Sequence, residues 1–259
     1  MHKTSKIKGV YLGVAVALSL VSTPASATIV YDANVTPDII FGSGNSNGSF
    51  TVDRSSGVEL GLRAKIPFTG TLHSNGDGTY SYTLAEANPK WNFDWTVNTD
   101  YSGTTGNVIN SFTYEIGIDF DPGIGTDFFA FDPITPSTAA PFYDHSIGTN
   151  STGNGGGAEV PLSNPPTAAE LAAAPGLYQT LIGNNNVLQQ SWRHAFFTAL
   201  SGKSYDPTIG GTYDIYLAAF ANGVQVARTD IQVTVPEPAP FALMALSLLG
   251  MGLYRRKRR

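Results

Sequence analysis

Alternation of apolar and polar residues with a period of two runs through the body of this chain. Because successive side chains of a β-strand point to opposite faces, the pattern predicts strands with one buried and one solvent-facing side. It recurs at residues 58–66, 80–84, 91–97 and 112–120, and twice more between residues 213 and 235. About nine or ten such strands predict an all-β fold, an antiparallel β-sandwich with the jelly-roll as one possible arrangement.

Turn residues separate these runs. The sequence Asn-Gly-Asp-Gly at 75–78 accepts positive φ and predicts a hairpin between strands around Thr71 and Tyr80. Asn222 and Gly223 predict a second hairpin near the end of the body. The apolar positions change parity along its return strand, which predicts a one-residue bulge within residues 227–230.

One short helical insertion interrupts the strands. Thr167 and Glu170 have the spacing of a capping box, Ala-rich residues follow, and Pro175 with Gly176 predicts the end of the helix. Residues 132–166 precede it and are rich in Pro and Gly, which predicts a long irregular loop.

Both ends of the chain have the composition of targeting helices. Lysines at positions 3, 6 and 8 precede an apolar run, and Ala25-Ser26-Ala27 is a small-residue cleavage site. Residues 1–27 are therefore predicted to be a signal peptide, with a mature chain that begins at Thr28. The β-sandwich domain is expected to occupy residues 28–234.

The segment 235–259 has three parts in a fixed order. The turn comprises Val235, Pro236, Glu237 and Pro238, and an apolar run of residues 239–254 follows it. The last five residues are basic: Arg255, Arg256, Lys257, Arg258 and Arg259. As a helix the apolar run would cover roughly 24 Å, short of the ~30 Å hydrocarbon core, which favours a temporary anchor over a permanent one. The basic residues are expected to stay cytoplasmic, so the body lies across the inner membrane.

This order resembles the PEP-CTERM sorting signal of bacteria that produce exopolysaccharide. The resemblance implies processing by an exosortase-type enzyme during transfer to the cell surface or extracellular matrix. Phrases at residues 41–45 and 48–54, and the closing hairpin that runs into the Pro-Glu-Pro turn, resemble uncharacterised proteins that carry this signal. That second resemblance implies no activity.

Charge and cysteine content exclude several functions. Residues 28–235 contain seven basic and 19 acidic side chains, a formal charge of −12. Such a surface repels nucleic acid and anionic lipid, whereas it tolerates neutral polysaccharide and attracts cations. The chain has no cysteine, so thiol catalysis and cysteine-ligated metals are excluded.

The best candidate for a metal site is the acidic segment 119–127. Asp119, Asp121 and Asp127 alternate with Gly123 and Gly125, and such carboxylates can surround Ca²⁺. Calcium is therefore the one cofactor that the sequence suggests, with Glu115 and Asp132 as further oxygen ligands. The spacing does not match an EF-hand, and the alternative is a solvated loop in an acidic protein.

Histidine and tryptophan are weaker candidates. His73, His145 and His194 match no known spacing of metal ligands or catalytic bases. Trp91 and Trp95 share the parity of a buried face, while Trp192 is compatible with either a core position or a sugar-stacking surface.

The leading functional prediction is a non-enzymatic surface or matrix protein that contacts exopolysaccharide. One alternative is an exported polysaccharide-active enzyme, which requires carboxylates such as Glu59, Glu86, Asp94 or Glu115 to face each other in a cleft. Another is a carbohydrate-binding module with Trp192 exposed beside the long loop.

Overall fold

The protein is described here by a computed structural model that covers residues 28–69, 72–87, 91–137, 143–206 and 208–236. The predicted signal peptide, with Ala25 and Ala27, lies outside these ranges, as does the tail from Glu237 to Arg259. Val235 and Pro236 are therefore the only residues of the predicted sorting turn within the part that the structure describes.

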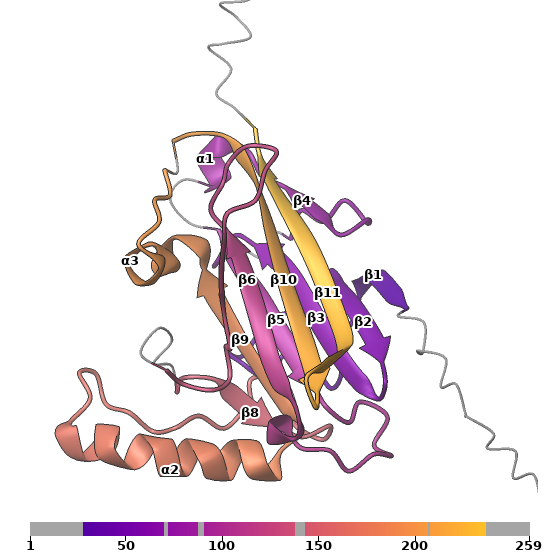
Figure 1. Ribbon diagram of the computed structural model, residues 1–259, viewed down its shortest axis with the longest axis vertical. Helices are drawn as coiled ribbons and strands as arrows, with labels where there is room; N and C mark the ends of the chain where they lie inside the picture. The colour runs from indigo at the N-terminus through magenta and orange to yellow at the C-terminus, as the bar shows by residue number, and fades with distance from the viewer. Residues whose placement is uncertain (1–27, 70–71, 88–90, 138–142, 207, 237–259) are drawn as a thin grey trace, which may run out of the picture.

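Eleven strands form two sheets in the described residues (Figure 1). The first sheet has the order β1-β2-β3-β5-β9-β8 and is antiparallel throughout. Its strands are β1 (Ile29–Ala33), β2 (Phe50–Ser55), β3 (Val58–Lys65), β5 (Asn92–Asn98), β9 (Val187–Arg193) and β8 (Ser146–Gly148). The second sheet has the order β4-β11-β10-β6-β7. Its strands are β4 (Thr79–Ser81), β11 (Val224–Val235), β10 (Gly211–Ala221), β6 (Thr113–Asp119) and β7 (Phe128–Phe131).

The main core lies between the two sheets and contains the apolar positions of the period-two pattern. Leu60 and Leu62 of β3, Trp95 of β5, and Ile215 and Leu217 of β10 belong to one buried cluster and are 0% exposed. Removal of this apolar surface from water is the main force that holds the sheets together. The prediction of an all-β, largely antiparallel fold is thus confirmed, while the strand order does not establish a jelly-roll.

The prediction of one solvent-facing side is wrong for the centre of the first sheet. All eight residues of β3 are buried, and so are Asp94, Thr96 and Asn98 on β5. The segment 34–49 lies over this outer face and adds a second small core of Val35, Ile39, Phe41, Phe50 and Val52. Gly61 makes this close approach possible, because a Cβ there would lie 2.8 Å from Val35 Cγ1.

The closing hairpin forms as predicted. Asn222 and Gly223 have φ of 52° and 78° in the turn between β10 and β11. The predicted bulge is also present, but the register shift falls between Ala219 and Phe220, opposite Gln225 and Ala227. The extra residue is therefore Val226, one position before the predicted range.

The turn at residues 75–78 exists, but its return strand has an unexpected partner. Asn75 N donates to Thr79 O over 2.9 Å, and Ser74 forms a single antiparallel bridge with Tyr80. The strand that follows, β4, instead pairs in parallel with β11. The chain then turns into a short helix α1 (Leu84–Ala87), so the expected continuation of the strand to Leu84 is wrong.

The helical insertion is longer than predicted. Helix α2 (Ala168–Asn184) begins with the predicted capping box of Thr167 and Glu170, but it continues through Pro175. Tyr178 and Ile182 beyond the proline are buried against the main core, and this packing offsets the backbone hydrogen bond that proline cannot make.

Shorter elements complete the fold. They are η1 (Ile109–Ser111), η2 (His194–Phe197) and α3 (Thr198–Ser201). The long segment before α2 is less irregular than expected, since it contains β8 and a bridge from Ile147 to Ala158. Among the helices of the described residues, none has the length and apolar character needed to cross a membrane.

Candidate functional site

The outer face of the first sheet carries polar side chains in rows across three neighbouring strands. The register of β3, β5 and β9 aligns Lys65, Asn92 and Arg193 in the row nearest the end of the sheet. The next row contains Arg63, Asp94 and Ser191. Side chains directly opposite one another on adjacent strands lie about 5 Å apart at Cβ, so the two rows form one polar patch.

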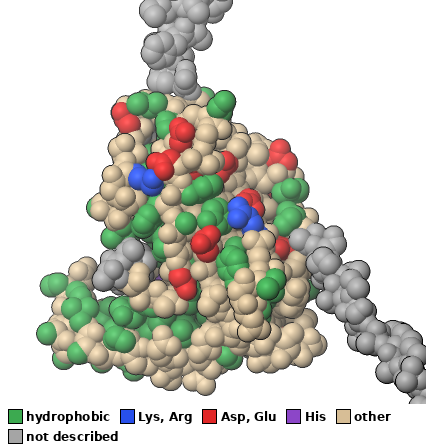
Figure 2. Space-filling model, viewed as in Figure 1, with side chains coloured by type: hydrophobic (Ala, Val, Ile, Leu, Met, Phe, Trp, Pro, Cys, Tyr) green, Lys and Arg blue, Asp and Glu red, His purple; other side chains and the backbone are tan. Residues whose placement is uncertain are grey.

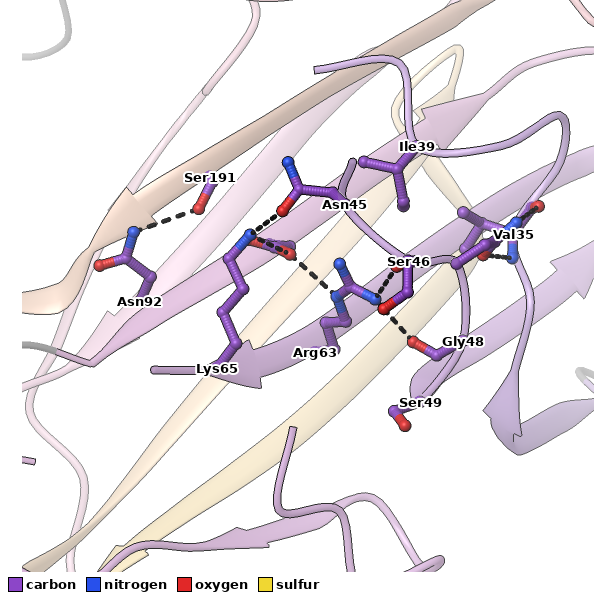
Figure 3. Close-up of polar contacts among 12 residues, drawn as sticks. Val35, Ile39, Asn45, Ser46, Gly48, Ser49, Arg63, Lys65, Asn92 and Ser191 are labelled. Atoms are coloured by element: carbon purple, nitrogen blue, oxygen red, sulfur yellow. Dashed lines mark hydrogen bonds and ion pairs between the residues drawn. The ribbon is translucent and has the colours of Figure 1, made fainter. Parts of the chain in front are cut away.

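Three charges of this patch make a buried network (Figure 3). Arg63 Nε donates to Asp94 Oδ2 over 2.8 Å, and Lys65 Nζ lies 3.0 Å from the same oxygen. Arg63 Nη1 also donates to the carbonyls of Ser46 and Gly48, each over 2.8 Å. Burial of charge is costly unless it is paired and hydrogen-bonded, and this network pairs Asp94 Oδ2 with two cations, while Asp94 Oδ1 has no hydrogen-bond partner among the described residues.

Farther from Lys65 along the strands, the segment 34–49 covers the polar rows of the outer face and separates them from solvent. Glu59 is 0% exposed, accepts from Thr36 N over 2.7 Å and pairs with Arg54. Burial raises the pKa of Glu59, although these partners oppose the effect. Gln189 holds the segment as well, because its amide donates to Asp38 O and accepts from Ile40 N. The inner rows are therefore structural.

The outermost row opens into two adjoining hollows, which we call the outer-face groove. One hollow of about 560 Å³ is lined by Lys65 and Phe68, and the other, of about 460 Å³, by Arg193 and Phe196. Asn92 and Ser191 line both hollows and so join them. Asn92 Nδ2 donates to Ser191 Oγ over 3.2 Å (Figure 3). Among the described residues, no group donates to the buried Asn92 Oδ1.

Positive charge gathers at this groove although the body is acidic. Six of the seven basic residues of the body lie within the described ranges, and three of these six are Arg63, Lys65 and Arg193. Arg193 alone among the six has no described carboxylate within ion-pair distance. The opposite face, over β6, β10 and β11, shows more acidic than basic side chains (Figure 2).

One carboxylate lines the groove beside these cations. Asp144 borders the hollow that contains Arg193, and burial raises its pKa, with a smaller contribution from the nearby charge of Glu159. Gln190 donates to the backbone carbonyl of Asp144 over 2.6 Å and fixes this part of the chain against β9.

In the predicted calcium loop, the carboxylates bond to backbone N–H groups and to a lysine and are not arranged as ligands of a metal ion. Asp119 is 0% exposed, and its Oδ1 accepts from the backbone N–H groups of Asp121 and Asp127 over 3.0 and 2.6 Å. Asp127 forms an ion pair with Lys203, and Asp121 accepts from Gly123 N. No group of three or more His, Asp or Glu side chains within the described ranges is arranged to hold a metal ion. Calcium binding at this loop stays a prediction that the geometry does not support.

The three histidines of the body lie in separate places. His73 is near the surface, 3.0 Å from Glu86. His145 is buried and lies 3.0 Å from the Tyr178 hydroxyl, while His194 stacks on Trp91 and lies 2.7 Å from Asp119 O. Burial lowers the pKa of His145 to about 3 and that of His194 to about 4, so both are neutral at physiological pH.

The tryptophans belong to the core. Trp91 and Trp95 are buried as expected, and Trp192 is only 5% exposed, packed among Phe93, Trp95 and neighbouring rings. A sugar-stacking surface on Trp192 is therefore wrong. The exposed aromatic rings of the groove are Phe68 and Phe196, at 103% and 52% exposure.

The four carboxylates suggested for an enzyme do not share a cleft. Glu59 and Asp94 lie on one face but four residues apart along the register, about 13 Å. Glu86 lies in α1 and contacts Thr83 and His73, and Glu115 accepts from the Tyr216 hydroxyl on the far side of the second sheet.

The sequence placed Lys65 and Asn92 only at separate polar positions of alternating runs, and it gave no assignment for Arg193. The available signal was weak: basic residues are rare in the body, and two of them, Arg63 and Lys65, fall in one strand. Their proximity to Arg193 depends on the pairing of β5 with β9, whose paired residues are 89 to 101 positions apart in the chain.

Comparison with known proteins identifies one segment. Residues 234–259 match the family model described as the PEP-CTERM protein-sorting motif. No curated protein and no solved structure matches the chain. The match covers the predicted turn, apolar run and basic residues, and it begins at the last residues of β11. The chain thus carries a PEP-CTERM protein-sorting motif and is an exported protein that an exosortase processes at the membrane.

Proposed function

We propose that the protein is a non-enzymatic component of the cell surface or extracellular matrix that binds exopolysaccharide through the outer-face groove. Residues 239–254 hold it briefly in the inner membrane, and exosortase processing near Pro236 then releases it for deposition with the polysaccharide. The sorting motif supports the route. The single observation that carries the binding role is the pairing of polar hydrogen-bonding groups with exposed aromatic rings in one groove.

The chemistry of the groove suits a saccharide. Sugar hydroxyls both donate and accept hydrogen bonds, and the groove offers the Arg193 guanidinium and the Lys65 ammonium as donors and Asn92 Oδ1 as an acceptor. The apolar faces of sugar rings pack against aromatic rings, and each hollow has one exposed ring, Phe68 in the first and Phe196 in the second. A groove rather than a closed pocket also suits a polymer.

The lining of the groove favours binding over hydrolysis. Glycoside hydrolysis requires two carboxyl groups, roughly 5 to 9 Å apart, on either side of the bond that is cleaved. Asp144 is the single carboxylate among the described residues that line the two hollows. Its raised pKa would suit a general acid, but the described lining offers no second carboxylate to act as nucleophile or base.

Binding of the host exopolysaccharide by wild-type protein and by Arg193→Gln tests the proposal. Arg193 is exposed and has no ion-pair partner among the described residues, so its loss should not disturb the fold, while the loss of a charged hydrogen bond to the ligand should weaken binding about tenfold. Arg228→Gln is the matched control, because it removes the same charge from the opposite face. Equal binding by all three proteins would exclude the groove as the binding surface.

The same experiment, repeated with calcium and with a chelator, tests the predicted cofactor. Polysaccharide binding that chelation abolishes would point to the loop of Asp119, Asp121 and Asp127. Binding that chelation leaves unchanged, together with a loss in Arg193→Gln, would support the groove without a metal.

A further inference from the structure

The sorting motif leaves almost no linker between the folded body and the proposed membrane anchor. Val235 is the last residue of β11 and pairs with Gly211 of β10, and it is 3% exposed. The apolar run begins at residue 239, four residues later. Because an extended chain spans at most ~3.6 Å per residue, the end of β11 lies within about 14 Å of the start of the anchor.

The ends of several strands lie toward the end of β11, and we call the loops attached to them the tail-side end: residues 66–69, 120–127, 194–206 and 208–211. Residues 66–69 belong to it because the register aligns Lys65 with Asn92 and Arg193, directly before His194. Thr212 N donates to Pro122 O over 3.1 Å, which places the 120–127 loop beside the start of β10. Lys203 pairs with Asp127, and His194 lies 2.7 Å from Asp119 O. Figure 1 shows α1 and the loop that follows β6 at the end where β11 finishes, and α3 farther down at the side of the sheets.

The tail-side end carries the most exposed apolar side chains in the described residues. Ile124 is 110% exposed and Phe68 is 103% exposed, each at the tip of its loop. Phe196 and Ile209, at 52% and 51%, belong to the same end. Phe68 also has a φ of 68°, a backbone conformation that is unfavourable for a bulky residue. Exposed apolar groups gathered at one end of a protein mark a surface for interaction.

We propose that the tail-side end rests on the membrane surface until the exosortase acts, with Phe68 and Ile124 in the lipid interface. This inference rests on the proposed function, because it requires residues 239–254 to be inserted. The short connection fixes which end faces the membrane, and the exposed apolar tips match the partly apolar environment of the interface. The opposite end, with Val224, then lies about 40 Å from the bilayer, the length of β11.

The unpaired charges at this end have both signs. Asp121 and Asp206 have no basic partner, and Arg193 has no acidic partner, among the described residues. They therefore favour neither anionic nor cationic headgroups, and neutral lipid tests the apolar contact alone. Lys65, Asn92 and Arg193 lie at the same end, so membrane contact covers the outer-face groove, which becomes accessible to polysaccharide only after processing.

The absence of cysteine allows a direct test. Single variants Phe68→Cys, Ile124→Cys and Val224→Cys of protein spanning residues 28–259 are labelled with an environment-sensitive fluorophore and reconstituted into phosphatidylcholine vesicles. Val224 is the matched control, since it is 67% exposed and lies in the turn at the far end. Quenching by lipids that carry a spin label in the acyl chain reports contact with the bilayer.

The expected result is strong quenching at positions 68 and 124 and little at position 224. Flotation of the same samples separates the two hypotheses. Protein that does not float with the vesicles would contradict the anchored intermediate of the proposed function, and the membrane-facing surface with it. Protein that floats but shows equal or no quenching at the three positions would keep the anchor and overturn the membrane-facing surface.

Discussion

Acidification should destabilise the body through two buried histidines, and the size of the effect follows from their surroundings. His145 and His194 are each 0% exposed, and burial lowers their pKa values to about 3 and about 4. In the unfolded chain both have a pKa near 6.5, so the unfolded state binds more protons as the pH falls below that value. Stability is therefore full above about pH 6.5 and decreases progressively below it.

Between pH 8 and pH 5 each histidine should reduce the free energy of unfolding by about 2 kcal/mol, since the unfolded form gains 1.36 kcal/mol per pH unit below 6.5. The sum of about 4 kcal/mol is a large part of the 5–15 kcal/mol typical of a domain. Burial also raises the pKa values of Glu59 and Asp144, which opposes the loss at the acidic end of this range. This carboxylate contribution is the same in wild-type protein and in every histidine variant, so it cancels when they are compared.

Urea unfolding at pH 8 and pH 5, followed by the fluorescence of the buried tryptophans, measures the difference. His145→Asn and His194→Gln should each remove about 2 kcal/mol of the pH dependence, whatever they do to absolute stability. Wild-type protein measured at the same two pH values is the reference. Buried-site variants that keep the full wild-type difference between the two pH values would refute the reasoning.

Further predictions concern packing and charge, and urea unfolding checks each of them. Arg63→Met should cost more than about 2 kcal/mol because it leaves buried Asp94 with Lys65 as its one cationic partner and removes a donor from two backbone carbonyls. Arg228→Met, at an exposed pair, should cost less than about 1 kcal/mol; equal losses would contradict the assigned role of burial. Gly117→Ala should cost about 1–3 kcal/mol, since its Cβ would lie 2.0 Å from the Tyr216 ring. Gly176→Ala, within α2 and with no atom nearby, should instead stabilise by about 0.5–1 kcal/mol, and a loss there would show that the helix is packed differently.

Patterns among neighbouring residues correctly predicted those strands, helix starts and turns whose geometry depends on neighbouring residues. The alternating runs became strands, the capping box began α2, and Asn222 with Gly223 made the closing turn. The parity change predicted a bulge within one residue of its position at Val226. Predictions failed where packing at a distance outweighed a local signal, as at Pro175, where the buried second half of α2 maintains the helix.

The candidate site shows more clearly the same difference between local signals, which the sequence contains, and long-range packing, which it does not. Alternation assigned Arg63, Lys65 and Asp94 to a polar face, and that assignment is correct. It could not reveal that residues 34–49 cover this face, because a covering loop has no periodic pattern and its contacts are long-range. The predicted water-facing strand is therefore buried on both sides, and its charges form a network.

The sequence by itself determined that the protein is exported through a sorting motif, and it determined the class of its fold. A sorting motif is read as a linear segment, and strand periodicity follows from the geometry of the backbone, so neither requires knowledge of distant contacts. Only the tertiary structure decided which polar rows open into a groove and which apolar tips share the end where β11 finishes. Those groupings depend on strand order and loop packing, which are set by contacts between residues far apart in the chain.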